Sequence, residues 1–197
     1  MTTAFQNIVL VFRILTILVG LSVAAPPAEA GLFELGSSGN YRISRIDKDN
    51  YQEMVSYTGS ISYYFWEMSA IELSYTEGEQ IVVLKIPDEN KTTTTTIFRM
   101  AGLDLVLTLA GKESPFQPYI KVGGAYIKKE MYREVETLGT DRLPSSEGLV
   151  PSAGVGFKIK LTDAMSIKMG VDAWTSPSNQ EPTTIDYAGR AGISWMF

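Results

Sequence analysis

The sequence predicts an all-β protein in which eight antiparallel strands follow one another in an up-and-down arrangement within residues 31–197. Three observations support this fold class. Apolar and polar residues alternate along eight segments, and short and long connections alternate between those segments. After residue 30, no segment of useful length shows the hydrophobic period of a helix. Strict alternation is the pattern of a strand whose two faces meet different environments.

The segment 55–65, VSYTGSISYYF, shows the pattern most clearly. Its odd positions are apolar or aromatic, apart from Gly59, whereas its even positions are mostly Ser and Thr. The same reading applies to residues 71–75, 103–109, 153–161, 166–174 and 186–197. Two less regular strands are predicted at 33–45 and 118–129, which brings the total to eight.

The predicted connections differ in length on the two sides of the strands. Short, turn-rich connections lie near residues 67–69, 111–115 and 162–164, and longer polar ones cover about 47–52, 78–96, 131–147 and 176–183. Tight turns at one end and long polar loops at the other are typical of up-and-down barrels of the outer-membrane type. Within the second long connection, the apolar run IVVLKI is interpreted as strand that continues the hairpin, and a binding loop is the alternative.

The N-terminal region predicts export. Residues 8–25 are almost wholly apolar but are interrupted by Arg13, and the run after Arg13 is short for a membrane-spanning helix. Ala28 and Ala30 fit the small-x-small pattern of a signal cleavage site, so residues 1–30 are predicted to be a cleavable signal peptide. An uncleaved membrane anchor is the alternative interpretation.

Composition argues against several classes of function. The chain has no Cys and no His, which removes thiolate chemistry, the commonest general base and the commonest metal ligand. A formal net charge of −5 gives no electrostatic case for nucleic acid. We therefore expect no enzymatic activity, no cofactor and no metal site; the less favoured alternative is an outer-membrane enzyme with a carboxylate-pair or Ser-Lys mechanism, to which no spacing in the sequence points.

The faces of the strands indicate which side points into the barrel. The interior of an eight-stranded barrel is only wide enough for side chains to fill it. The apolar faces carry many bulky aromatic residues, among them Tyr57, Phe65, Tyr75, Phe157 and Trp195, whereas the other faces carry Ser, Thr, Gly and charges. The apolar faces are therefore predicted to point outward into a bilayer, which makes this a transmembrane β-barrel.

The polar lumen should then hold nine charged residues, four acidic and five basic. They are Glu72, Asp104, Lys121, Lys158, Lys160, Lys168, Asp172, Asp186 and Arg190. Buried charges must be paired. The first hypothesis is a structural ion-pair network that fills a barrel without a pore; the alternative is a narrow or gated path for ions or small solutes.

The phrases PYIKVGGAY and KLTDAMSIKMGVDAW and the terminal ISWMF resemble the OmpA/OmpX-like family of outer-membrane β-barrels. The resemblance implies a Gram-negative-type outer-membrane location, contact with outer-membrane lipid and lipopolysaccharide, and a monomer. It also implies that Ile193, Trp195 and Phe197 form an assembly signal for the barrel-assembly machinery. The chain departs from the OmpA pattern because no peptidoglycan-binding domain follows the predicted barrel.

The long connections suggest a role at the cell surface. Loops on a rigid scaffold often carry function, and the stretches GEQIVVLKIPDENK and EVETLGTDRLPSSEG hold much of the non-periodic sequence. We therefore expect a structural or surface-recognition role with a surface ligand whose identity is open.

Overall fold

The computed structural model describes residues 33–45, 47, 50–66, 69–85, 90–136, 139–175 and 185–197. The predicted signal peptide, with Ala28 and Ala30, lies outside these ranges. The described residues contain eight strands, which are β1 Phe33–Arg45, β2 Tyr51–Trp66, β3 Ser69–Leu84, β4 Thr92–Thr108, β5 Phe116–Val135, β6 Gly139–Lys160, β7 Met165–Thr175 and β8 Ile185–Met196.

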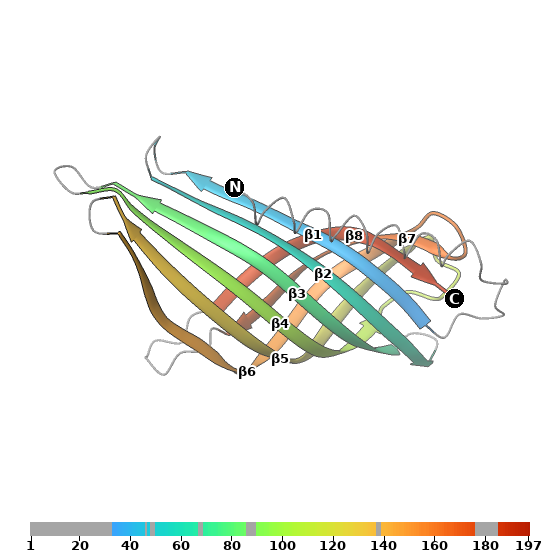
Figure 1. The fold of residues 1–197 in the computed structure, drawn as a ribbon. Coiled ribbons are helices and arrows are strands. Elements are labelled where there is room, and N and C mark those ends of the chain that lie inside the picture. The colour runs from blue at the N-terminus through green and yellow to red at the C-terminus, as the bar shows by residue number, and fades with distance from the viewer. Residues whose placement is uncertain are drawn as a thin grey trace. The chain divides into compact units, whose positions relative to one another are not determined.

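The strands form one closed antiparallel barrel in sequence order, which confirms the predicted fold class. Each strand pairs with its neighbours in the chain, and β1 closes the ring on β8 from Glu34 opposite Met196 to Gly39 opposite Ala191 (Figure 1). Closure gives every strand two partners, and β1 and β8 pair with each other over these six residues of each strand. No described helix is long and apolar enough to cross a membrane.

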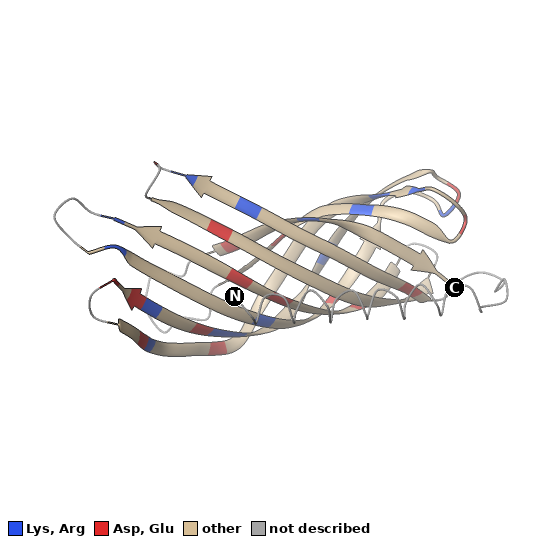
Figure 2. Cartoon of the chain, turned by 45° about the horizontal axis from the view of Figure 1, so that its top comes forward, with Lys and Arg blue, Asp and Glu red and all other residues tan. Residues whose placement is uncertain are grey.

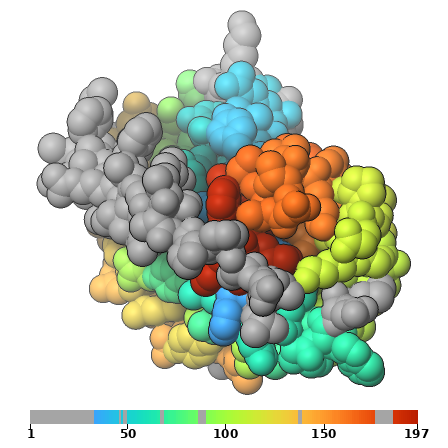
Figure 3. All heavy atoms as spheres, turned by 90° about the vertical axis from the view of Figure 1, so that its right-hand side faces the viewer, coloured from blue at the N-terminus to red at the C-terminus, as the bar shows by residue number. Residues whose placement is uncertain are grey.

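The two ends of the barrel differ. At the inner end, where β1 begins and β8 ends, the connections 109–115 and 161–164 are short, and Figure 3 shows them in the foreground in yellow-green and orange. β5 and β6, which are joined at the opposite, outer end, are 20 and 22 residues long. A bilayer crossing needs about 9–11 residues in a tilted strand, so this hairpin is long enough to extend well beyond the crossing.

The predicted long connections at 78–96 and 131–147 are therefore largely wrong. Strand β3 continues to Leu84 and β4 starts at Thr92, while β5 continues to Val135 and β6 starts at Gly139. The interpretation of IVVLKI as strand is confirmed for Ile81–Leu84. These outer segments lack apolar alternation because β3 ends in the unbroken apolar run Ile81–Leu84 and β4 begins with the polar run Thr92–Thr96, so an alternating pattern does not reveal them.

The outward face carries an apolar belt between two aromatic zones. Near the inner end, Phe33 and Tyr63 pack with ring centroids 5.2 Å apart, and Phe116 and Phe157 with centroids 5.4 Å apart. Toward the outer end, Tyr57, Tyr75, Tyr126 and Tyr187 are all exposed. Aromatic girdles of this kind mark the two interfaces of a bilayer.

A row of charged residues follows the outer tyrosines. Glu77 on β3 lies opposite Arg99 on β4, Arg99 opposite Lys128 on β5, and Lys128 opposite Glu147 on β6. Glu77, Arg99 and Glu147 are exposed and Lys128 is half-buried, and Arg99 Nε lies 3.0 Å from Glu77 Oε1. Because charges avoid hydrocarbon, this row gives the expected outer limit of the belt.

Candidate functional site in the barrel lumen

The inward faces of the strands bring eight charged residues together near the middle of the barrel. This lumen cluster consists of Glu34, Glu72, Asp104, Lys121, Lys158, Lys168, Asp172 and Arg190. Their side chains are at most 14% exposed. The four carboxylates and four cations balance in charge, which is the condition under which buried ions are tolerated.

Glu72 of β3 is at the centre of the lumen cluster. Its side chain has no exposed surface, and its carboxylate contacts three cations from three different strands. Lys168 Nζ lies 2.5 Å from Oε2, and Lys121 Nζ and Arg190 Nη2 each lie 3.5 Å from Oε1. Glu72 therefore connects β3 with β5, β7 and β8 across the lumen.

Lys121 of β5 holds a second set of contacts. Its Nζ lies 3.1 Å from Asp172 Oδ1 and 3.3 Å from Asp104 Oδ2, in addition to Glu72. Ser152 donates a hydrogen bond of 2.6 Å to the other oxygen of Asp104. Arg190 Nε lies 2.8 Å from Asp172 Oδ2, so these groups form one connected set.

Glu34 of β1 forms the inner part of the cluster. It accepts a hydrogen bond of 2.9 Å from Lys158 Nζ and one of 2.7 Å from the hydroxyl of Tyr64. Lys168 links this part to Glu72, because its Nζ also lies 3.6 Å from Glu34 Oε1. The rings of Tyr64 and Tyr119 lie about 5 Å from the ammonium groups of Lys158 and Lys168.

Inward-facing glycines make room for these side chains. A Cβ at Gly154 would collide with Asp172 Oδ1 and the side chain of Lys121, and a Cβ at Gly156 would collide with the hydroxyl of Tyr119. The Gly residues of β6 therefore allow long charged and aromatic side chains to cross a narrow interior.

An apolar layer lies between the cluster and the outer end. It consists of Ala125, Ile127, Val150 and Trp174, with Met100 and Ala188 packed against them. On β5, Ala125 and Ile127 follow Lys121 toward the outer end, and on β6, Val150 precedes Gly154. The interior thus combines a buried ionic cluster with an apolar cluster contributed by β4 to β8, and both restrict the space through which an ion could pass.

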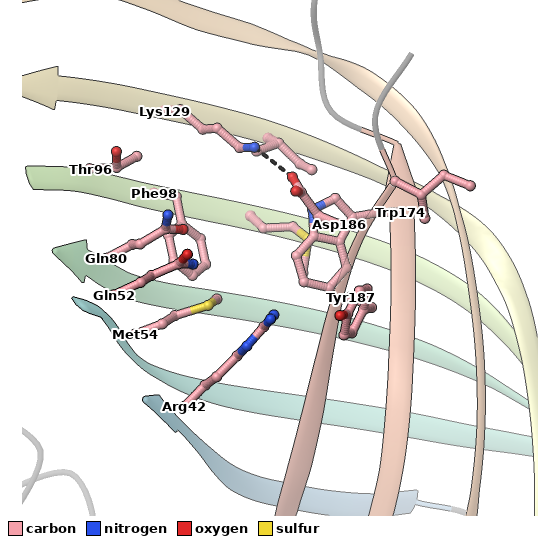
Figure 4. Close-up of a pocket in the computed structure, with 13 residues that line it drawn as sticks. Arg42, Gln52, Met54, Gln80, Thr96, Phe98, Lys129, Trp174, Asp186 and Tyr187 are labelled. Atoms are coloured by element: carbon pink, nitrogen blue, oxygen red, sulfur yellow. Dashed lines mark hydrogen bonds and ion pairs between the residues drawn. The ribbon is translucent and has the colours of Figure 1, made fainter. Parts of the chain in front are cut away.

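A cavity of about 200 Å³ lies on the outer side of the apolar layer. Figure 4 shows Arg42, Gln52 and Gln80 pointing into this outer cavity from β1, β2 and β3, with Lys129 joined to Asp186 on the far side. Its apolar lining includes Met54, Phe98, Ile127 and Trp174.

The structure brings seven of the nine predicted lumen residues into the cluster. Asp186 does not belong to it, because its carboxylate pairs with Lys129 Nζ at 2.7 Å in the outer cavity. Lys160, the last residue of β6, is half-buried at the inner end, and no ion pair of Lys160 is found among the described residues. Both corrections have one reason: inward orientation places a side chain in the lumen without fixing its height along the barrel.

Glu34 and Tyr64 belong to the site and are absent from the prediction. A signal was available for both, since Glu34 alternates with Phe33 and Leu35, and Tyr64 alternates with Tyr63 and Phe65. The alternation gives their inward orientation, but only the closed ring brings Glu34 to Lys158, which is 124 positions away in the chain.

The predicted assembly segment faces outward. Ile193, Trp195 and Phe197 are 52%, 36% and 41% exposed, and Phe197 follows the last residue of β8.

The described residues contain no group of three acidic residues arranged to hold a metal ion.

No protein-family model and no curated protein sequence matches this chain. Solved structures do match it. Neisserial surface protein A is 14% identical, with 85% of this chain and 98% of that chain covered at a TM-score of 0.57. The N-terminal barrel domain of Pseudomonas aeruginosa OprF is 15% identical, with 86% and 100% covered at 0.54.

The chain has the fold of the eight-stranded outer-membrane β-barrels. OprG, an outer-membrane protein of Pseudomonas aeruginosa, is also similar, at 16% identity, 86% and 97% coverage and a TM-score of 0.53. This outcome agrees with the OmpA-like resemblance of the sequence. In an outer-membrane barrel, the exposed aromatic zones would meet lipid. The lumen cluster would then take the place that the apolar core has in a soluble protein.

Proposed function

We propose that this chain is a small integral outer-membrane β-barrel protein of the Gram-negative type, with a closed lumen and a structural or surface-recognition role. The observation that carries the proposal is the charge-balanced lumen cluster, in which each of the eight ions contacts at least one ion of opposite sign. The apolar layer beside it adds a second barrier. The fold and the outward aromatic zones support the membrane location.

A gated ion path is the second candidate, and one observation favours it. Lys121 contacts three acids, while Lys168 and Arg190 contact two each. Shared partners allow the pairs to be exchanged, and a rearrangement that separates them would leave a polar gap. The apolar layer would also have to open, which makes the closed lumen the better supported candidate.

Planar-bilayer recording of the refolded protein without its first 30 residues tests the closed lumen. We expect a membrane current equal to that of the protein-free bilayer. A control reconstitution into vesicles, followed by a heat-modifiable shift on a gel, shows that folded barrel is present. Steady conductance steps from correctly folded protein would contradict the proposal.

The outer end is the proposed surface for recognition. Figure 2 shows acidic and basic residues along the strand ends on the left. On the β5–β6 hairpin, the exposed Arg142 lies 3.8 Å from Glu130 and over the ring of Tyr132. A surface ligand would meet this mixture of charge and aromatic surface, while lipid and lipopolysaccharide would contact the belt and the charged row above it. We also propose that the protein is a monomer and that it is not an enzyme. The second proposal is supported by a sequence that contains no His and no Cys.

Phe197 is proposed to contribute to assembly by the barrel-assembly machinery more than to stability. Burial of one such side chain contributes about 1.5–3 kcal/mol at most, and Phe197 remains 41% exposed. We expect Phe197→Ala to lower the amount of barrel assembled in the outer membrane, with little change in unfolding of the refolded protein. Phe33→Ala, at the same end and equally 41% exposed, is the matched control. Equal assembly of the wild type and both variants would refute the role.

A further inference from the structure

We propose that the outer cavity is a binding site for a small carboxylate that carries a short apolar chain. This inference goes beyond the proposed function and holds whether the lumen cluster is static or gated, because the cavity lies on the outer side of the apolar layer.

The floor of the cavity is suited to an apolar chain. Met54, Phe98, Ile127 and Trp174 line it and are each less than 9% exposed. Phe98 packs over Gly78, where a Cβ would collide with its ring, so this floor is shaped by the sequence of β3 as well as β4. Burial of a few methylene groups here is favourable, because it removes apolar surface from water.

The wall of the cavity is suited to an anion. Its charged residues are Arg42, Lys129 and Asp186, and Lys129 already pairs with Asp186 at 2.7 Å. Arg42 forms no ion pair among the described residues, and its guanidinium lies 5.1 Å from the ring centroid of Tyr187. Figure 4 shows it pointing into the cavity, with the amides of Gln52 and Gln80 close to the same space.

The balance of charge selects the sign of the ligand. Lys129 and Asp186 neutralise each other, so the three charged residues of the cavity carry a net charge of +1, which Arg42 supplies. A guanidinium presents paired N–H donors that match a carboxylate, and two glutamine amides add neutral donors and acceptors. A carboxylate at Arg42 with its chain on the floor would therefore use both halves of the cavity.

The size of the cavity limits the ligand. A volume of about 200 Å³ corresponds to roughly six or seven water molecules at about 30 Å³ each. The ligand therefore has the size of a short-chain acid. Because the floor of the cavity is closed, the ligand would bind there and would not pass through the barrel.

Trp174 in the floor provides a direct probe. The chain has three Trp residues, and Trp66 and Trp195 can be replaced by Phe so that Trp174 remains the single reporter. In this background, refolded in detergent and checked by its heat-modifiable shift, we expect hexanoate to change the fluorescence saturably. Acetate, which lacks the chain, and hexanol and hexylammonium, which lack the anion, should bind more weakly.

Arg42→Gln in the same background should weaken hexanoate binding at least about tenfold, as expected for a lost hydrogen bond between charged groups. Arg45→Gln is the matched control, three residues along β1 at its exposed end, and should bind as the parent does. No saturable signal, equal binding of hexanol, or equal loss in both arginine variants would overturn the proposal. If Arg42→Gln does not fold, the comparison of hexanoate with hexanol and hexylammonium decides by itself.

Discussion

Glu72→Gln is expected to lower the free energy of unfolding by about 3–5 kcal/mol, the usual cost of removing one partner from a buried ion pair. The amide keeps the shape of the side chain but removes the charge that faces Lys121, Lys168 and Arg190. The cluster is left with one excess positive charge inside a narrow interior. Chemical unfolding in lipid vesicles, followed by tryptophan fluorescence, measures the loss.

Glu77→Gln is the matched control on the same strand. Glu77 also pairs with a cation, Arg99, but both side chains are more than half exposed. Exposed pairs contribute about 0–1 kcal/mol, so this variant should unfold close to the wild type. Similar losses for the two variants would show that the lumen cluster is not buried as the structure has it.

Leu103→Arg is expected to destabilise the barrel in a bilayer by about 2–4 kcal/mol, the cost of a cation on the lipid-facing side near the bilayer midplane. Leu103 is 57% exposed on the outward face of β4, opposite Leu73 of β3. The measurement is the unfolding free energy in vesicles, since water in a detergent-free solution would remove the penalty.

Ile97→Arg tests the outer limit of the belt on the same face of β4. Ile97 lies beyond Arg99 and opposite Glu79 on one side and Glu130 on the other. Its cost should be close to that of an interfacial site, about 0–1 kcal/mol. An equal penalty at positions 97 and 103 would contradict the charged row as the boundary of the membrane.

The sequence was sufficient for the strands that face two different environments. The predicted bounds of the first strand, 33–45, are those of β1, and the outward orientation of residues such as Tyr57 and Leu103 follows from their alternation. The outer ends of β3 to β6 could not be predicted in this way. Their sequences contain an unbroken apolar run at Ile81–Leu84 and a polar run at Thr92–Thr96, so no hydrophobic period distinguishes strand from loop.

The membership of the lumen cluster was predictable in part. Alternation indicates that Glu72 and Lys121 point inward, but their contact depends on the register of β3 with β4 and of β4 with β5. Glu34 needs in addition the closure of β1 on β8. Pairing across a ring depends on register and on the height of each residue, and neither is encoded in local sequence.

Measuring both the stability and the conductance of the Arg190→Ala variant distinguishes a closed lumen from a gated path. Arg190 contacts Glu72 and Asp172, and its side chain is 11% exposed. A closed lumen predicts a loss of about 3–5 kcal/mol together with a silent bilayer, because the apolar cluster that includes Ile127 and Trp174 still narrows the interior. Little loss of stability together with a cation-selective conductance absent from the wild type would contradict the closed lumen.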